Sequence, residues 1–128
     1  NPVYYVQYAH ARTVNILKHA QEQGYDGIPA QEADLALLDR PEEVALIKAV
    51  GALPEMIENA TLAYEPHRMT GFLRNVASAL HTFYFNHKVV RDDQPLALTQ
   101  SRLILINATR IVLRNGLSVI GVSAPDKM

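Results

Sequence analysis

The chain contains no cysteine among its 128 residues. A disulfide framework and a thiolate zinc site are therefore excluded, and a reducing cytosol is the expected setting. No apolar run approaches the length of a membrane span, and no charged, apolar and small-residue leader opens the chain. These absences predict a soluble, cytoplasmic protein with no membrane partner.

Sustained strand alternation is also missing, and helix signals dominate the sequence. The hydrophobic content of 48% is enough for one core without staples. We therefore expect an all-α fold, a single-domain helical bundle over residues 1–128. Because the chain starts at Asn1 rather than Met, we also expect it to be a fragment of a longer protein.

Motifs that carry catalysis are absent from the sequence. It has no glycine-rich phosphate loop, no Gly-x-Ser-x-Gly elbow and no carboxylate pair at an obvious spacing. His81 and His87 are six residues apart and point away from each other on a helix, so no metal site is expected. His10 lies on an apolar stripe and is interpreted as a hydrogen-bonded core histidine. We expect no catalytic residue and no cofactor in this domain.

The first half of the chain has clear helix punctuation. A helix is predicted from Pro2 to about Gln23, with Asn1 as its cap and Gly24 after its end. The stretch 24–38 is predicted to be a loop with a short turn of helix over Ala33–Leu38.

A second helix begins at Asp39-Arg40-Pro41-Glu42, which has the spacing of a capping box. Gly51 and Pro54 interrupt it, and the proline removes a hydrogen-bond donor. We therefore expect a break before a further helix over Glu55–Tyr64.

The helix that opens at Glu65-Pro66 has the clearest apolar stripe. A polar connection over Lys88–Pro95 follows it, and then a central apolar helix over Leu96–Asn115. Asn115-Gly116 is expected to end that helix, and Leu117–Val122 to return over the core. The stripe consists of Met69, Leu73, Val76, Leu80 and Phe83, widened by Phe72 and Ala77.

The first helix divides into two opposed faces at about 100° per residue. One face is predicted to be the core, and it carries Val3, Val6, His10, Val14 and Leu17. The opposite face carries Tyr5, Tyr8, Arg12 and His19, where an ordinary amphipathic helix has Lys and Glu. Two rings and a cation one turn apart form a surface suited to unstacked nucleotides.

A second group of side chains projects away from the stripe of the helix at Pro66, namely Arg74, Ser78, His81 and Phe85. A large aromatic on that side must be covered by something. Another helix or a missing domain could pack on it, which would make the chain a structural or protein–protein interaction module. Alternatively, Phe85 is part of a base-stacking surface with Tyr84 and Asn86 beside it.

Charge is unevenly distributed between the two halves of the chain. Residues 1–65 carry four basic and ten acidic side chains, a net of −6, whereas residues 66–128 carry eight and three, a net of +5. A surface for an anion should therefore draw on the second half, together with Arg12 and Lys18.

Four segments of the chain resemble one known family in the right order. They are Asn1-Pro2-Val3-Tyr4-Tyr5-Val6-Gln7-Tyr8-Ala9-His10-Ala11-Arg12, Glu65-Pro66-His67-Arg68 leading into Leu80-His81-Thr82-Phe83-Tyr84, Ala108-Thr109-Arg110 with Asn115-Gly116-Leu117, and Ala124-Pro125-Asp126-Lys127-Met128. Together they are similar to the C-terminal domain of bacterial arginyl-tRNA synthetases, and the resemblance covers the whole chain.

This resemblance implies an all-helical DALR anticodon-binding domain that binds the anticodon loop of an arginine tRNA, whose middle base is a cytosine. It places anticodon contacts at Tyr5, Tyr8, Tyr84, Asn86 and Met128. It also implies a class I catalytic domain that uses ATP, absent from this sequence, as a second partner. The fragment alone should not aminoacylate tRNA.

The mechanism expected from these residues is recognition of a splayed single-stranded loop. Aromatic rings stack on the bases, and Arg12 and Arg74 hold phosphates. The candidate tRNA-binding residues are therefore Tyr5, Tyr8, Arg12, Arg74, His81, Tyr84, Phe85, Asn86 and Met128.

Overall fold

Five α-helices and two short 3-10 turns make up the computed structural model, with no strand in the part of the chain that it describes. That part is the backbone of residues 1–63 and 66–128, with the side chains of residues 1–58 and 67–128. The all-α prediction is confirmed. The elements are α1 (Pro2–Glu22), η1 (Ala30–Glu32), η2 (Leu35–Leu37), α2 (Pro41–Gly51), α3 (Leu53–Ala63), α4 (Pro66–Asn86) and α5 (Leu96–Val119).

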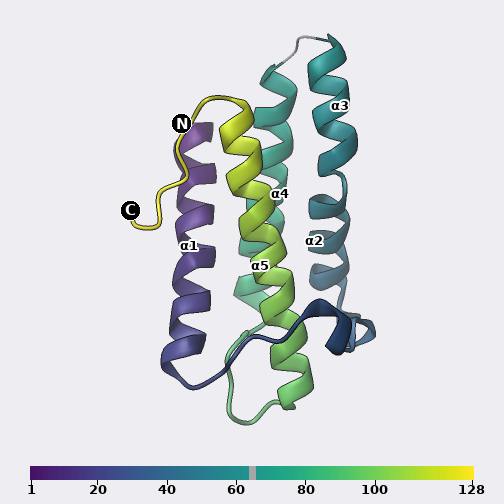
Figure 1. The fold of residues 1–128 in the computed structure, drawn as a ribbon, viewed down its shortest axis with the longest axis vertical. Helices are drawn as coiled ribbons and strands as arrows, with labels where there is room; N and C mark the ends of the chain where they lie inside the picture. Colours follow the sequence, from purple (N-terminus) through teal and green to yellow (C-terminus); the bar gives the residue numbers. More distant parts are fainter. Residues whose placement is uncertain (64–65) are drawn as a thin grey trace.

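The helices form a bundle of four parallel or antiparallel rods, because α2 and α3 follow one another nearly end to end (Figure 1). Helix α5 packs against α1, α4 and α2, and α4 contacts every other α-helix. After α5 the chain crosses the beginning of α1 and descends along its outer side (Figure 1). Both termini therefore lie beside α1.

Helix α1 begins and ends where its sequence signals predict. The Asn1 side chain accepts a hydrogen bond from the Val3 amide at 2.9 Å, and Gly24 has a φ of 86°, which favours glycine. The loop that follows differs in detail from the prediction. The single turn expected over Ala33–Leu38 is replaced by η1 and η2.

Helix α2 starts one residue later than the capping-box spacing predicts. Arg40 is its cap, and the Glu43 carboxylate accepts from the Arg40 amide at 3.0 Å. The predicted pair of Asp39 and Glu42 is wrong because Glu43 is the acid that points inward, where it pairs with Arg102. The break between α2 and α3 is confirmed, whereas the predicted end of that segment at Tyr64 lies outside the described residues.

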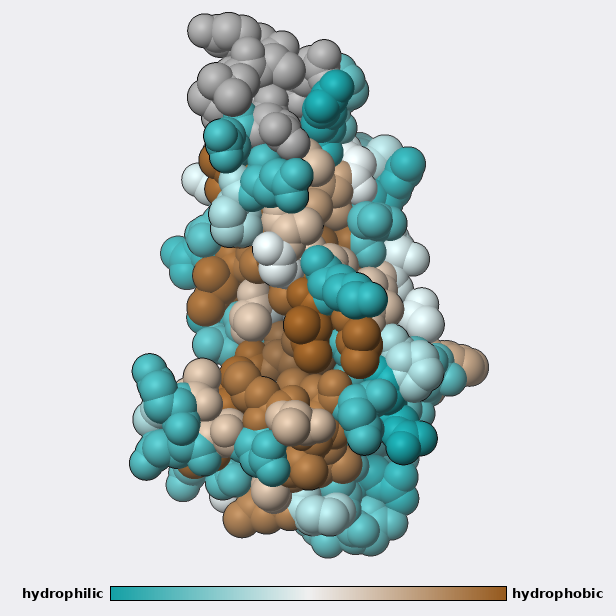
Figure 2. Space-filling view, turned by 90° about the vertical axis from the view of Figure 1, so that its right-hand side faces the viewer, coloured by the Kyte–Doolittle hydropathy of each residue, from teal (hydrophilic) through white to brown (hydrophobic). Residues whose placement is uncertain are grey.

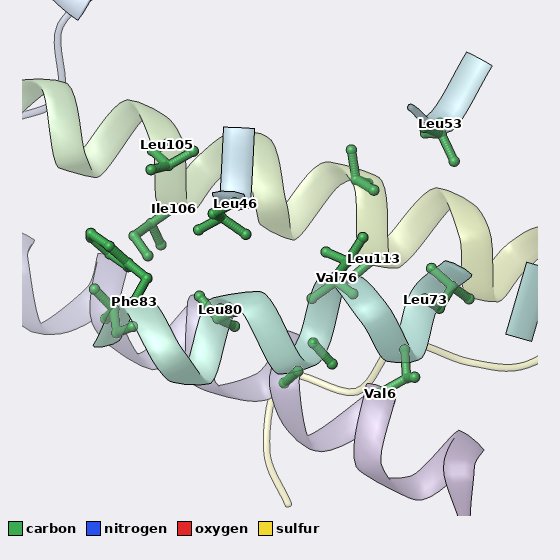
Figure 3. Packing of buried hydrophobic residues seen from close by; sticks show 14 of the residues in the cluster. Val6, Leu46, Leu53, Leu73, Val76, Leu80, Phe83, Leu105, Ile106 and Leu113 are labelled. Atoms are coloured by element: carbon green, nitrogen blue, oxygen red, sulfur yellow. The ribbon is translucent and has the colours of Figure 1, made fainter. Parts of the chain in front are cut away.

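The core is one continuous cluster between α4 and its neighbours (Figure 3). The predicted stripe of α4 is confirmed, since all five of its members are fully buried. Figure 3 shows Leu80 and Phe83 of α4 on the side that faces Leu46 and Ile106.

The buried face of α1 is rotated from its predicted position. Val6 is buried as expected, but Val14 and Leu17 are only half-buried. The rotation arises because α1 packs against both α4 and α5. Residues beside the predicted stripe, such as Ala9, Thr13 and Ala20, therefore face the bundle. The buried residues of α1 are Val6, Ala9, His10, Ala11, Thr13, Ile16 and Ala20.

Helix α5 runs past Gly116, so the predicted helix end there is wrong. A Cβ atom at Gly116 would collide with the Leu73 side chain of α4. This glycine permits the close approach of two helices rather than ending one. The chain turns instead at Gly121, whose φ is 74°. The first residues of the expected return over Leu117–Val122 belong to α5, which ends at Val119.

By length and composition alone, α5 is apolar enough to cross a membrane, contrary to the expectation from the sequence. Half of its most apolar window is buried inside the bundle. It also carries the buried Arg102 and packs against three other helices. These are the features of a core helix in a globular domain.

Hydrophobic side chains also gather on the outer face of the bundle on the side of α2 and α3 (Figure 2). Exposed apolar residues of this part of the chain are Leu35 and Leu37 of η2 and Ile47 of α2. These three residues lie on elements that do not line the pocket between α1 and the end of α4.

Candidate functional site

A pocket of about 600 Å³ lies between α1, the end of α4 and the C-terminus of the chain. The charged side chains of its lining, those of Arg12 and Lys88, are basic, and Tyr8, Tyr84 and Phe85 contribute aromatic rings. Pocket A, as we call it, is lined by Tyr8, Ala11, Arg12, Asn15, Ile16, His19, Tyr84, Phe85, Lys88, Val89, Val90 and Met128.

Arg12 lies between two tyrosine rings in pocket A. Its guanidinium carbon is 5.6 Å from the centroid of the Tyr8 ring and 5.2 Å from that of Tyr84. Both rings are partly exposed, at 42% and 37%. Cation–π contacts of this kind hold the guanidinium in place while the outer sides of the rings remain available. The arrangement joins a fixed positive charge to two stacking surfaces.

His81 supports this cluster from behind. Its ring centroid is 5.3 Å from that of Tyr5 and 6.0 Å from that of Tyr8, and its Nδ1 atom is 3.3 Å from Arg12 Nη1. A guanidinium can only donate, so Nδ1 accepts and the ring proton is on Nε2. Burial, and then the charge of Arg12, lower the pKa of His81 below its usual range. The ring is therefore neutral at pH 7.

Acidification should destabilise the protein through His81. Because the pKa of His81 is lower in the folded chain than in the unfolded chain, the unfolded state binds more protons between the two values. The free energy of unfolding should therefore fall as the pH drops below about 6.5, the ordinary histidine value. In His81→Gln this part of the decline should disappear, as urea unfolding between pH 7.5 and 5 would measure. Parallel curves for the two proteins would contradict this account.

Phe85 is the most exposed ring of the site, with 89% of its surface accessible. It lies next to Tyr84 at the last turn of α4 and extends the aromatic lining of pocket A. Asn86 is its neighbour but not among the lining residues. The Asn86 side-chain amide donates to the Thr82 carbonyl at 2.7 Å, so its donor is engaged within α4.

Two predicted residues lie elsewhere than expected. Tyr5 is half-buried against the core and His81. Its predicted place on the face opposite the core is therefore wrong, because the rotation of α1 turns it toward α4. Arg74 is exposed on α4 about 10 Å before His81 along the helix axis and does not line pocket A. The structure brings together Tyr8, Arg12, Tyr84, Phe85 and Met128 and places His81 behind them.

A polar network around the buried Arg102 holds the loop after α4, whose residues Lys88, Val89 and Val90 line pocket A. Arg102 Nε donates to Glu43 at 2.9 Å, and its Nη1 donates to the Lys88 carbonyl at 3.0 Å and to Gln94 at 2.9 Å. Gln94 in turn donates to the Val89 carbonyl at 3.0 Å. The Lys88 side chain is exposed and lines the pocket.

The C-terminal segment reaches pocket A along α1. Gln7 Nε2 donates to the Ser123 carbonyl at 2.9 Å, and His10 Nδ1 lies 2.9 Å from the Pro125 carbonyl. His10 is buried, as predicted for a hydrogen-bonded core histidine. Three residues beyond Pro125, Met128 lines the pocket and remains half exposed.

Sequence reasoning missed Asn15, Lys88 and Val90 as lining residues. Asn15 lies one turn after Arg12 on the same side of α1, so helical spacing could have identified it. Lys88 and Val90 lie in an irregular loop, and their position depends on hydrogen bonds from Arg102 and Gln94, which no local pattern signals.

Known proteins and one protein family match all or nearly all of this chain. The DALR anticodon binding domain family matches residues 6–128. The chain is 48% identical over 128 residues to an arginine–tRNA ligase of Moorella thermoacetica and 45% identical to that of Geobacter metallireducens. In both cases the match covers 100% of this chain and 22% of the relative.

Solved structures give the same result for the fold. A structure from Campylobacter jejuni that is assigned to the arginyl-tRNA synthetases matches 100% of this chain and 27% of its own, with a TM-score of 0.83 and 30% identity. The arginyl-tRNA synthetase of Thermus thermophilus matches 97% of this chain and 21% of its own, with a TM-score of 0.75 and 28% identity. The chain thus spans about a fifth to a quarter of the length of these proteins.

Proposed function

Because the chain belongs to the DALR anticodon binding domain family, we propose that pocket A binds the anticodon loop of an arginine tRNA. The observation that carries this proposal is the cluster of Tyr8, Arg12, Tyr84 and Phe85, which joins exposed rings to a fixed cation. Bases of a splayed loop stack on the rings, and phosphates contact Arg12 and Lys88.

For the whole protein, we propose the activity that its relatives are named for, arginine–tRNA ligation. ATP and arginine would then be bound by the catalytic domain that resembles those of the relatives, and the protein would work in the cytoplasm. This chain contributes tRNA affinity and selectivity, because correct loop binding is coupled to placement of the distant acceptor end.

The catalytic domain is the proposed second partner of this chain. Its contact surface is the apolar face of Leu35, Leu37 and Ile47, which are exposed on η2 and α2. Apolar surface of this kind is typical of contacts between domains. Since these residues lie on other elements than pocket A, both partners can bind at once.

The proposed function is tested by titrating the full-length protein with an arginine tRNA and with the same tRNA carrying a changed middle anticodon base. We expect the changed base to weaken binding at least tenfold, because a buried polar edge loses its partner. Binding should also depend on salt. With Arg12 and Lys88 on phosphates, a fourfold rise in salt should lower the affinity about sevenfold.

Equal affinity for the two tRNAs would contradict anticodon recognition. Affinity that does not change with salt would exclude the phosphate contacts. Both results together would favour the alternative interpretation, in which the exposed rings bind another protein.

A further inference from the structure

We propose that Gln7 and His10 form a latch that positions the C-terminal segment, residues 121–128, so that Met128 stands in pocket A before RNA arrives. The inference rests on the proposed function of the pocket and assigns a positioning role to two residues outside its lining. Neither residue lines pocket A. They act through the main chain of the segment.

The latch consists of two hydrogen bonds from α1 to the C-terminal segment. Gln7 and His10 are three residues apart on α1 and so lie on one side of the helix. Their acceptors are the carbonyls of Ser123 and Pro125. The two acceptors are two residues apart in the segment, and both bonds come from the same helix. Attachment at two points therefore fixes both the position and the direction of the segment.

His10 shows that this latch is not simply a stabilising core contact. Its Nδ1–H donates to the Pro125 carbonyl, because a carbonyl can only accept. Its Nε2 atom is buried and has no hydrogen-bond partner among the described residues. An unsatisfied buried nitrogen lowers stability, and an apolar residue would fill the same space without that cost. The histidine is explained by its one bond to the segment.

The latch lowers the cost of binding RNA. Met128 is the third residue after Pro125, so a segment fixed at Pro125 keeps Met128 within about 10 Å of it. Without the two bonds, the segment would have to be ordered when the RNA binds, and the loss of conformational freedom would weaken the complex. Met128 would still be present in the chain but less often in pocket A.

The test is a cycle of variants in the full-length protein, titrated with an arginine tRNA transcript. Gln7→Ala and deletion of residues 126–128 should each weaken binding about three- to tenfold. In the deletion background, Gln7→Ala should have no further effect, because the latch then has nothing to position. His10→Leu should behave like Gln7→Ala. Gln21→Ala, an exposed glutamine of the same helix outside pocket A, is the matched control and should bind normally.

A second measurement reports the latch directly. Backbone amides of residues 123–128 should exchange hydrogen several times faster in Gln7→Ala than in the wild type, with an unchanged melting temperature, whereas Gln21→Ala should match the wild type. The proposal is overturned if Gln7→Ala binds tRNA normally, or if it weakens binding equally with and without residues 126–128. If the latch fails in this way while a changed middle anticodon base still weakens binding, the proposed function stands. If the changed base has no effect on the wild type, the proposed function itself fails.

Discussion

Replacing Arg102 by alanine is expected to lower the free energy of unfolding by about 3–5 kcal/mol. The side chain of its partner Glu43 is fully buried, so the variant leaves a carboxylate in the core without its counter-charge. The Lys88 carbonyl and the Gln94 side chain also lose a donor. Because Lys88 begins the loop that lines pocket A, tRNA binding should weaken as well.

Urea unfolding of three variants of this protein distinguishes this effect from the loss of an exposed ion pair. Arg91→Ala breaks an exposed pair with Asp93 and should cost no more than about 1 kcal/mol. The double variant Glu43→Leu with Arg102→Met removes both charges and should be more stable than Arg102→Ala alone. If Arg102→Ala were no less stable than Arg91→Ala, Arg102 would not be the centre of a buried network.

Replacing Phe85 by alanine is expected to produce a large loss of tRNA affinity. Stacking of one base on an aromatic side chain contributes about 1–3 kcal/mol, which corresponds to about five- to 150-fold in affinity. Phe85 is the most exposed ring of pocket A, so the free energy of unfolding should change by no more than about 0.5 kcal/mol. A loss of binding without a loss of stability would assign the ring to a partner rather than to the fold.

Tyr4 provides the matched control for Phe85. It is also an exposed aromatic, at 57%, but it does not line pocket A. Tyr4→Ala should bind an arginine tRNA as the wild type does. An equal loss in the two variants would mean that any exposed ring of this domain contributes, and the pocket would have no special role.

Much of the fold follows from local sequence signals. The stripe of α4 repeats every three or four residues and is fully buried, as predicted. The cap at Asn1, the glycine at Gly24 and the break near Pro54 also appear where expected. Each of these features depends on a few neighbouring residues, so the sequence alone contains the necessary information.

The parts that could not be predicted depend on contacts between distant segments. The rotation of α1, which buries half of Tyr5, depends on how α4 and α5 pack against it. Gly116 has the local signature of a helix end but serves the contact with Leu73. The chain at Lys88 follows the hydrogen bonds of Arg102. The sequence therefore indicates which residue types could form the candidate site. It does not indicate which of these residues contact one another in the folded chain.

The central claim is that pocket A recognises the anticodon arm rather than another part of the tRNA. It is tested most directly by the dissociation constants of wild type and Phe85→Ala for an intact arginine tRNA and for the same tRNA without its anticodon arm. We expect the variant to bind the intact tRNA at least fivefold more weakly and the truncated tRNA as well as the wild type does. A loss of the same size for both RNAs would contradict the claim.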